Sequence, residues 1–497
     1  MKSVELNPIE KLMVGVNKVA DAVGGTLGAT GRNVFLDVMP PRITNDGKTI
    51  ADSIDLEDRL ENLGAWLIKN AAAQTNDDVG DGTTTTTILT AEIIKEALKR
   101  PENAMDISRS LKSSLPGILA SIREGSREVT DVKEVALISA EHEDLAEKIA
   151  ALITEVGPDG TIRVEENNEP VISYEVVDGY EANAGYMSPH FVNTDHGTAE
   201  FDDAPVFCSQ KKISTIGDIS RLFEQLKEAK ATRLVIVADD IDPEILGVFV
   251  MNKKMGLLNI SVIKASGTLL EDIATTTGAT LVGDSGGVNF DNFDFALHMG
   301  QAKVISTDKK TIFQSKAPTA KAEADRLDEL AKMSTNKFEA NRLHERAAKL
   351  RKGVAILRVG SSSTVEMAYL KDKADDAIHA TQAAMQEGVV EGGGMCLWRI
   401  AQGMHTDTIG EEILKRALCA PLKRICENSG KDYADIVGRF GLDDGYNAKY
   451  DTVTNLFDAG IVDPAKVERV AITNALLNAA QFITTHAAII EVKEAKV

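Results

Sequence analysis

The first part of the chain carries a helical pattern of apolar and polar positions. Apolar residues recur every three or four positions from Pro8 to about Val23, where Gly24 and Gly25 supply a stop signal. The same periodicity returns over about 57–76 and 83–99, with a Gly-Asp-Gly break at 80–82 between them. These segments predict a block of helices.

A shorter segment inside this block has the character of strands. Residues 33–39 have a strand-like composition, Pro40 and Pro41 follow them, and Asn45-Asp46-Gly47 has the composition of a turn. We therefore expect a strand, a turn and another strand after the first helix.

The pattern changes beyond about residue 160. Short apolar runs at 161–164, 171–176, 234–238 and 260–263 predict strands, and a helix is expected from Pro243. Alternating strands and helices are typical of an α/β domain. A charged helical pattern over 321–352, with a polar break at 334–336, predicts a helical hairpin, and helix returns from Ala374. The chain is therefore predicted to be a mixed α and α/β multidomain protein, in which outer helical segments pair and the middle is inserted.

Length and charge narrow the class of protein. A chain of 497 residues exceeds what one hydrophobic core usually organises, so about two to four domains are expected. Asp and Glu number 76 against 55 Lys and Arg, and this net charge of -21 repels phosphate backbones and anionic lipid surfaces. We expect no nucleic acid and no membrane among the partners.

The N-terminal segment and the cysteines indicate a compartment. The first residues lack the apolar run of a secretion signal, and no stretch reaches transmembrane length without charges. The cysteines lie mostly in apolar stretches without metal-ligand spacing; they are Cys208, Cys396, Cys419 and Cys426. We expect buried free thiols and a cytoplasmic location.

The most informative segment for function is Val79-Gly-Asp-Gly-Thr-Thr-Thr-Thr-Thr87. Free N–H groups at a helix start bind phosphate, hydroxyls add to them, and glycine lets the backbone approach closely. Because Asp81 cannot face phosphate unaided, a Mg²⁺ ion that bridges carboxylate and phosphate is expected. The alternative is a capped helix start with threonine as filler, which two glycines and five threonines disfavour.

Other polar positions leave more than one interpretation open. Asp46 and Asp376 could orient or deprotonate an attacking water, although a turn and an exposed helix are also ordinary places for aspartate. Gly47-Lys48-Thr49 is not a Walker motif, because Arg42 stands where its first glycine belongs. The Glu-Gly-Gly-Gly run at 391–394 fits either a helix break or close approach to a ligand.

Two predicted helices in the middle of the chain have large apolar surfaces. Residues 218–226 place Ile219, Leu222, Phe223 and Leu226 on one face, and 243–252 is apolar nearly all round. Core packing is the ordinary explanation. The alternative is an exposed groove for nonnative chains, for which Met251 would provide adaptable contacts.

These segments and several others resemble group I (GroEL-like) chaperonin motifs in the same order along nearly the whole chain. The Asp-Gly-Thr segment is shared with group II chaperonins, whereas 26–34 and 186–191 look like group I. The chain is thus identified as a divergent group I member. The motifs lie at 26–34, 43–47, 80–85, 185–191, 379–381, 387–394, 445–447 and 460–464.

The resemblance implies a chaperonin architecture of three domains. A mostly helical, discontinuous equatorial ATP-binding domain is expected at 1–121 and 387–497, and a small intermediate hinge domain at 122–177 and 355–386. An inserted α/β apical domain that binds clients is expected at 178–354. The partners implied are nonnative proteins, identical subunits in a ring that typically has seven, and a lid co-chaperonin as a candidate.

The resemblance also implies roles for single residues. Asp81 would bind Mg²⁺, with K⁺ as a further candidate ion, and Asp46 would help place the water or the metal. Asp376, on the hinge, would complete ATP hydrolysis after a domain movement. The remaining nucleotide-binding positions are Thr26, Leu27, Gly28, Gly47, Gly82, Thr83, Thr84, Thr85, Gly393, Asn447 and Asp463. The client-binding positions are Tyr186, Phe191, Phe223, Leu246, Val250 and Met251.

Departures from the family pattern leave two functional hypotheses open. Ala184 and Thr364 stand where the family commonly has an Arg and a Glu that pair between subunits, so the allosteric switch is expected to be weakened. His190 and Ser220 replace an aromatic residue and a leucine of the client surface. The main hypothesis is an ATPase and ATP-dependent molecular chaperone that promotes folding in a ring cavity. The alternative is a passive holdase or ring scaffold with weakened cycling.

Overall fold

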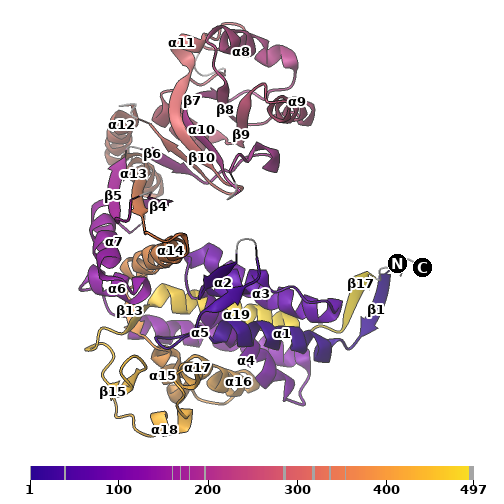
Figure 1. Cartoon of the computed structure of the whole chain (residues 1–497), viewed down its shortest axis with the longest axis vertical. Coiled ribbons are helices and arrows are strands. Elements are labelled where there is room, and N and C mark those ends of the chain that lie inside the picture. Colours follow the sequence, from indigo (N-terminus) through magenta and orange to yellow (C-terminus); the bar gives the residue numbers. More distant parts are fainter. Residues whose placement is uncertain are drawn as a thin grey trace. The chain divides into compact units, whose positions relative to one another are not determined.

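The computed structural model describes residues 2–38, 41–158, 160–167, 169–177, 179–194, 197–283, 287–315, 319–334, 337–352 and 354–491. Backbone contacts divide the chain into two compact units (Figure 1). Unit 1 consists of Met1–Thr154, Val164–Ser173 and Arg358–Val497, and unit 2 of Glu155–Arg163 and Tyr174–Leu357. The finer division of the chain into three domains stays a prediction.

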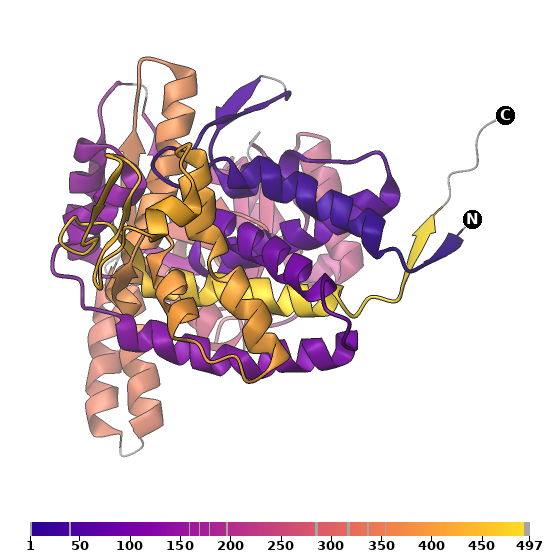
Figure 2. The ribbon, with the colours of Figure 1, turned by 90° about the horizontal axis from the view of Figure 1, so that it is seen from below.

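Unit 1 is mostly helical and is built from both ends of the chain. The C-terminal helix α19 packs against α3, α4 and α5, all from the N-terminal segment (Figure 2). The helices are α1 (Ile9–Gly24), α2 (Gly47–Ser53), α3 (Arg59–Val79), α4 (Thr83–Leu98), α5 (Ala104–Gly125), α6 (Val132–Ala140), α14 (Thr364–Glu387), α15 (Met395–Gly403), α16 (Ile409–Ala417), α17 (Ala420–Asn428), α18 (Tyr433–Val437) and α19 (Ala465–Phe482).

Four antiparallel strand pairs complete unit 1, among them a pair that joins the two ends of the described chain. They are β1 (Lys2–Leu6) with β17 (Ala487–Glu491), β2 (Val34–Leu36) with β3 (Arg42–Thr44), β13 (Val389–Glu391) with β16 (Val462–Pro464), and β14 (Gly445–Asn447) with β15 (Thr452–Thr454).

The helices predicted from periodicity are confirmed. Leu12, Val16 and Val23 of α1 are buried in the core of unit 1, as their spacing predicts. A close crossing holds α1 against α3, because a side chain at Gly15 would clash with the Glu61 carbonyl. On α3, Gly64 has the same role, because a side chain there would clash with the backbone of Leu12. Glycine is therefore required on both sides of this crossing.

One local prediction in unit 1 is confirmed only in part. A strand, a turn and another strand do follow α1, as the β2–β3 pair, but Asn45-Asp46-Gly47 is not the turn, because it comes after β3 and helix α2 begins at Gly47. The Asp46 carboxylate accepts hydrogen bonds from the backbone N–H groups of Lys48 and Thr49, at 3.3 and 2.7 Å. Aspartate suits a helix N-cap as well as a turn, and the composition of the segment does not separate the two.

Unit 2 is the expected α/β fold around a six-stranded sheet of order β6-β11-β10-β7-β8-β9. Strands β7, β8 and β9 run parallel, and the other neighbours are antiparallel. The elements are β6 (Gly179–Ala182), a 3-10 turn (Pro189–Phe191), β7 (Ala199–Ser209), α8 (Ile216–Glu228), β8 (Arg233–Ala238), α9 (Pro243–Lys254), β9 (Asn259–Lys264), α10 (Gly267–Thr277), α11 (Phe295–His298), β10 (Gly300–Ser306), β11 (Thr311–Gln314), α12 (Thr319–Met333) and α13 (Lys337–Lys352).

The central strands of this sheet are covered on both faces. In β8, Leu234 and Ile236 belong to one apolar cluster and Val235 and Val237 to another, because successive side chains of a strand point to opposite faces. Helices α8 and α9 contribute to the first cluster, and α10, α12 and α13 to the second. Burial on both faces explains why these strands are continuous apolar runs.

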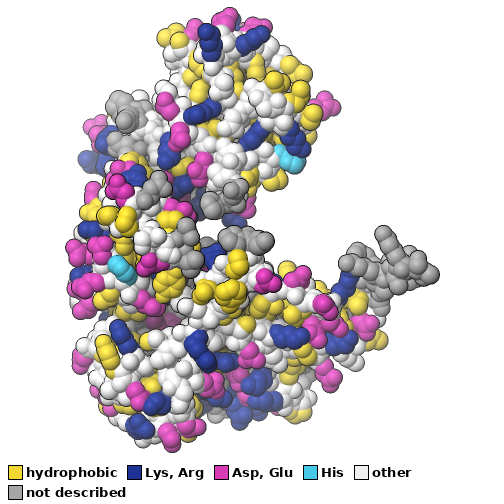
Figure 3. All heavy atoms as spheres, viewed as in Figure 1, with side chains coloured by type: hydrophobic (Ala, Val, Ile, Leu, Met, Phe, Trp, Pro, Cys, Tyr) yellow, Lys and Arg dark blue, Asp and Glu magenta, His cyan; other side chains and the backbone are white. Residues whose placement is uncertain are grey.

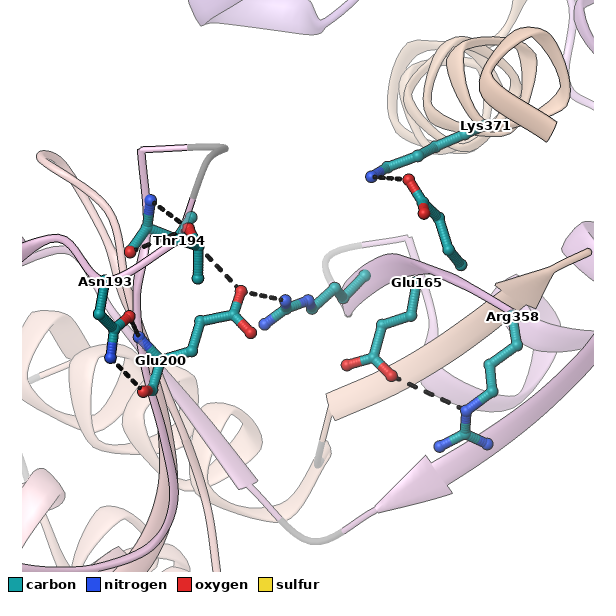
Figure 4. Close-up of polar contacts among 9 residues, drawn as sticks. Glu165, Asn193, Thr194, Glu200, Arg358 and Lys371 are labelled. Atoms are coloured by element: carbon teal, nitrogen blue, oxygen red, sulfur yellow. Dashed lines mark hydrogen bonds and ion pairs between the residues drawn. The ribbon is translucent and has the colours of Figure 1, made fainter. Parts of the chain in front are cut away.

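Four elements contain the boundary between the units: α7 (Glu143–Val156), β4 (Thr161–Glu166), β5 (Ser173–Val177) and β12 (Val354–Val359). The three strands form a sheet of order β4-β12-β5. Charged residues within these strands form ion pairs (Figure 4). Within unit 2, Glu200 accepts from Arg163 at 3.1 Å, and within unit 1, Arg358 lies 3.8 Å from Glu165.

Two further expectations can be compared with the structure. Cys208, Cys396 and Cys426 are buried and Cys419 is partly buried, and all four are free thiols. Burial raises the pKa of Cys208 to about 12. Among the described helices, we find none whose length and apolar character would let it cross a membrane.

Candidate nucleotide site

Backbone conformation explains both glycines that flank Asp81. Gly80 ends α3 with φ +69° and Gly82 precedes α4 with φ +79°, a left-handed region that disfavours other residues. Space is limited as well, because a side chain at Gly80 would clash with the His379 ring. A methyl group at Gly82 would lie 2.5 Å from Cγ1 of Val467. The chain therefore makes a tight, glycine-dependent bend that presents Asp81 between two helix ends.

Four of the five threonines that follow Asp81 fall into two groups. Thr86 and Thr87 are buried, and their hydroxyls donate to the carbonyls of Gly82 and Thr83 at 3.0 and 2.8 Å. These two threonines have a structural role. Thr84 and Thr85 are only partly buried, and no side chain caps α4 at Gly82. The first turn of α4 thus combines uncapped N–H groups with accessible hydroxyls, as a phosphate site requires.

The segment that carries Asp46 lies against this helix start. A methyl group at Gly47 would lie 2.5 Å from the Thr84 hydroxyl oxygen and 2.8 Å from that of Thr83. Only glycine permits this approach without displacing the threonines. The Asp46 carboxylate is oriented by its hydrogen bonds to the first turn of α2.

Helix α14 brings Asp376 into the same charged cluster within unit 1. Burial raises the pKa of Asp376 well above its ordinary value, and the carboxylates of Asp81 and Asp46 raise it further, while Lys373 opposes them. Burial also raises the pKa of Asp81, against the Gly82 N–H group and the charges of Lys373 and His379. Three aspartates that are distant in sequence therefore affect one another electrostatically.

This carboxylate set suits a divalent cation. Mg²⁺ commonly takes one or two protein carboxylates and completes its shell with phosphate oxygens and water. Among the described residues, no three His, Cys, Asp or Glu side chains converge closely enough to hold a metal alone. The donors therefore fit a metal that arrives with phosphate, and Asp81 is the carboxylate nearest the phosphate-binding turn by sequence.

The C-terminal candidates also gather in unit 1. Strand β13 pairs with β16, where Val390 lies opposite Asp463, and the Gly393 N–H group donates to Asp463. Burial and the charge of Asp81 raise the pKa of Asp463 to about 7. Asn447 is buried in β14, and a methyl group at Gly393 would lie 3.8 Å from the Tyr446 carbonyl oxygen.

Residues 26–28 form a constrained loop after α1. The Thr26 hydroxyl donates to the Val23 carbonyl at 2.8 Å, and Gly28 has φ +85°. The sequence reasoning missed Asn428, whose amide donates to the carbonyls of Gly24 and Leu27 at 3.0 and 2.8 Å. Asn428 lies 400 residues beyond this loop, so local patterns carry no sign of its role.

A second missed residue is Glu468 of α19. Its side chain is buried, its Oε2 atom has no hydrogen-bond partner within the described parts of the chain, and the carboxylates of Asp463 and Asp81 act on it. Burial chiefly raises its pKa to about 8. The sequence did offer a sign of this burial, because Glu468 shares a helix face with the apolar residues Val467, Val470 and Ala471.

Glu468→Gln is expected to make stability less dependent on pH. A carboxyl whose folded pKa is raised contributes stability that is complete below its unfolded pKa of about 4.5 and is lost as pH rises through about 8. The variant should therefore become more stable than the wild type, by up to a few kcal/mol, as pH increases across this window. Amide hydrogen exchange in α19, which carries Glu468, measures the difference when the nucleotide-free proteins are compared with each other at pH 5.5 and at pH 8.5. Parallel losses in both proteins would contradict the burial argument.

The predicted client-binding residues of unit 2 do not share one environment. Phe191 is fully buried in the core, and its contact with clients stays a prediction. Tyr186, Phe223, Leu246 and Val250 are partly buried at the edge of that core, and Met251 is 56% exposed. Core packing, the ordinary explanation, applies to Ile219, Leu222 and Leu226.

An apolar surface nevertheless remains around these helices. Four large apolar side chains near α8 and α9 are at least 56% exposed: Ile216, Met251, Met255 and Leu257. Figure 3 shows apolar side chains among charged ones over this part of unit 2. These exposed apolar side chains are candidates for contacts with other proteins.

The fold over the whole chain is that of a chaperonin. Residues 19–493 match the model of the TCP-1/cpn60 chaperonin family. The chain belongs to the TCP-1/cpn60 chaperonin family, as a divergent GroEL-like member. This membership supports a chaperone role.

Solved structures agree in fold. The crystal structure of the chaperonin gp146 from the bacteriophage EL 2 (Pseudomonas aeruginosa), in presence of ATP-BeFx, is similar in crystal form II with a TM-score of 0.73 and 19% identity. That match covers 99% of this chain and 100% of gp146. Crystal form I gives a TM-score of 0.67 and 20% identity over 99% of each chain.

Proposed function

We propose that this protein is an ATP-dependent molecular chaperone that binds nonnative proteins and promotes their folding through ATP binding and hydrolysis. The observation that carries the proposal is the electrostatic clustering of Asp46, Asp81 and Asp376 beside the uncapped start of α4. The similar phage chaperonin was crystallised in presence of ATP-BeFx, which supports nucleotide binding by this fold. The family supports the chaperone role.

Each part of the site has a separate task in this proposal. The first N–H groups of α4 and the hydroxyls of Thr83, Thr84 and Thr85 bind the phosphates. The rest of the nucleotide is bound by other residues of unit 1. They are residues 26–28, Gly47, Gly393, Asn447 and Asp463. Asp81 holds Mg²⁺, which when bound neutralises phosphate charge. K⁺ is a further candidate ion.

Asp376 acts as the proton acceptor for the attacking water, and Asp46 orients that water. A general base must accept a proton near the working pH, and a carboxyl with a raised pKa is better suited to this than an ordinary aspartate. Lys373 opposes the rise in the pKa of Asp376 by its positive charge. Asp46 is held for its task by the first turn of α2.

We further propose an assembly and a location. Identical subunits form a seven-membered ring, with equatorial, intermediate and apical domains at the boundaries predicted from the sequence, and a co-chaperonin covers the cavity. Unit 2 presents the exposed apolar side chains around α8 and α9 to clients. The free thiols suit the reducing cytoplasm.

A passive holdase or ring scaffold is the second candidate. It is favoured by Ala184, which is a buried small residue on the chain after β6 and has no charge to pair with a neighbouring subunit. Binding of clients to an apolar surface needs no ATP.

Refolding of a stringent denatured client separates the two candidates. The yield should rise severalfold when ATP is added, with or without a co-chaperonin, if the chain is an active foldase. A yield that ATP does not change, together with retained client binding, would favour the holdase and contradict the main proposal. Electron microscopy of the same samples counts the subunits in each ring.

A further inference from the structure

Helix α14 forms ion pairs through three consecutive residues located one turn before Asp376. Each pair involves a different element of unit 1, and the first of them is drawn in Figure 4. The pairs are Lys371 with Glu166 of β4 at 3.4 Å, Asp372 with Arg42 of β3, and Lys373 with Glu141 after α6 at 2.8 Å. This short part of α14 is thus attached on several sides.

The Arg42–Asp372 pair differs from the other two in what it connects. Asp372 and Asp376 are four residues apart on α14 and so lie on one face of that helix. Arg42 precedes Asp46 by four residues, and the short strand β3 leads directly to the N-cap position of Asp46. The pair therefore joins the helix that carries Asp376 to the segment that carries Asp46.

The charges around the site make such a connection necessary. Asp46, Asp81, Asp372 and Asp376 are all acidic, and like charges at close range repel one another. Without a cation between them, the acidic face of α14 would be pushed away from Asp46. Arg42 supplies that cation, and its planar guanidinium can hold a carboxylate in a defined direction.

The environment of the pair gives it more weight than an ordinary surface ion pair. The side chains of Arg42 and Asp372 are 37% and 29% exposed, so each is partly removed from water. Burial raises the pKa of Asp372 although Arg42 opposes the rise, which means that Asp372 without Arg42 would be poorly accommodated. Loss of Arg42 should therefore displace this turn of α14.

We propose that Arg42 is a positioning residue for ATP hydrolysis, which holds the Asp376 turn of α14 against the Asp46 segment through its ion pair with Asp372. Arg42 acts on the reaction through α14 and touches no reacting atom. The inference rests on the proposed ATPase function.

ATP turnover of the full-length protein tests the role of Arg42. Arg42→Ala should lower kcat by about 10- to 100-fold, since a misplacement of about 1 Å can cost that much, and should change KM for ATP little. Arg42→Lys should restore part of the loss. Asp372→Asn should also lower kcat, and the double variant should be no worse than Arg42→Ala, because both changes remove one interaction.

Amide hydrogen exchange of the nucleotide-free protein gives a readout that is independent of turnover. Exchange in 364–387 should become about fivefold faster or more in Arg42→Ala, since the helix loses one attachment. Exchange in α1 and α3 should stay unchanged, which would exclude a general loss of folding.

Arg469→Ala is the matched control. Arg469 donates to Glu387 at the other end of α14 at 2.9 and 2.6 Å, and their side chains are 37% and 36% exposed, which is close to the Arg42 pair. Its kcat should stay within about twofold of the wild type, since the pair lies 11 residues from Asp376.

Three results would overturn the inference: unchanged kcat in Arg42→Ala, an equal loss in Arg469→Ala, or fully additive losses for Arg42→Ala and Asp372→Asn. If the wild type itself does not hydrolyse ATP, the proposed function fails instead. The exchange measurement then still decides whether Arg42 holds α14, because faster exchange supports the attachment and unchanged exchange rejects it.

Discussion

Asp376→Asn is expected to lower kcat for ATP hydrolysis by about 10²- to 10⁴-fold, the usual contribution of a general base. Asparagine has nearly the same shape as aspartate, so the packing of α14 is kept. It cannot accept a proton from water, so the general base is lost. Affinity for ATP should remain close to that of the wild type, because the first turn of α4 supplies the phosphate contacts. Steady-state turnover and equilibrium nucleotide binding measure the two quantities separately.

The neighbouring Asp375 offers a matched control. Asp375→Asn makes the same substitution on the next residue of α14; Asp375 is more exposed to solvent than Asp376, although partial burial raises its pKa to about 7. Turnover by this variant should stay within a fewfold of the wild type. Comparable losses in both variants would show that net charge, and not proton transfer by Asp376, matters here.

The pH dependence of turnover gives a further check on Asp376. Burial and the nearby carboxylates raise its pKa, so the base is lost by protonation at a higher pH than an ordinary aspartate would be. The decrease of kcat toward acid should be present in the wild type and absent from the residual activity of Asp376→Asn. The same acid limb in both proteins would assign it to another group.

Arg346→Met is expected to destabilise unit 2 by about 3–5 kcal/mol, the range for breaking a buried ion pair from one side. Arg346 donates to Asp272 at 2.6 Å and to Glu271 at 3.0 Å, and the Asp272 side chain is only 5% exposed. Tyr180 also donates to Asp272, at 3.3 Å. Burial raises the pKa of Asp272 and Arg346 opposes the rise, so the variant leaves a buried carboxylate without its cation.

Amide exchange in α10, which carries Asp272, measures this loss within unit 2, where whole-chain unfolding of a multidomain protein would not be two-state. Arg351→Met is the control, because Arg351 lies on α13 like Arg346. Arg351 pairs with Asp325 and Asp328 at 2.8 Å on the surface, and it should contribute about 0–1 kcal/mol. Adding Asp272→Leu to Arg346→Met should recover most of the stability. Equal effects of Arg346→Met and Arg351→Met would contradict the burial argument.

Local patterns predicted much of the fold. The helices α1, α3 and α4 follow from apolar spacing, and the strands β8 and β9 from continuous apolar runs, because each pattern depends only on neighbours in sequence. The pairing of β1 with β17 could not be predicted in this way, since it joins residues almost 500 positions apart. The helix start at Asp46 was missed because N-caps and turns use the same residues.

The candidate site was predictable to a similar degree. Asp81 and its threonines are recognisable from the chemistry of one continuous segment. The charges of Asp46 and Asp81 reach Asp376 from distant segments, so its raised pKa is not visible in sequence, whereas Lys373 lies three residues before it on the same helix. Phe191 and Glu468 show the same limit, since an aromatic or acidic residue is compatible with a surface until packing buries it.

The sequence by itself determined that this protein has a helical part with a phosphate-binding helix start and an α/β part, because periodicity and glycine placement act locally. Only the tertiary structure decided which carboxylates share the site, which threonines are structural, and which apolar residues of unit 2 face solvent. Those properties depend on distances between segments far apart in the chain, and electrostatic interactions and burial are set by such distances and not by position along the sequence.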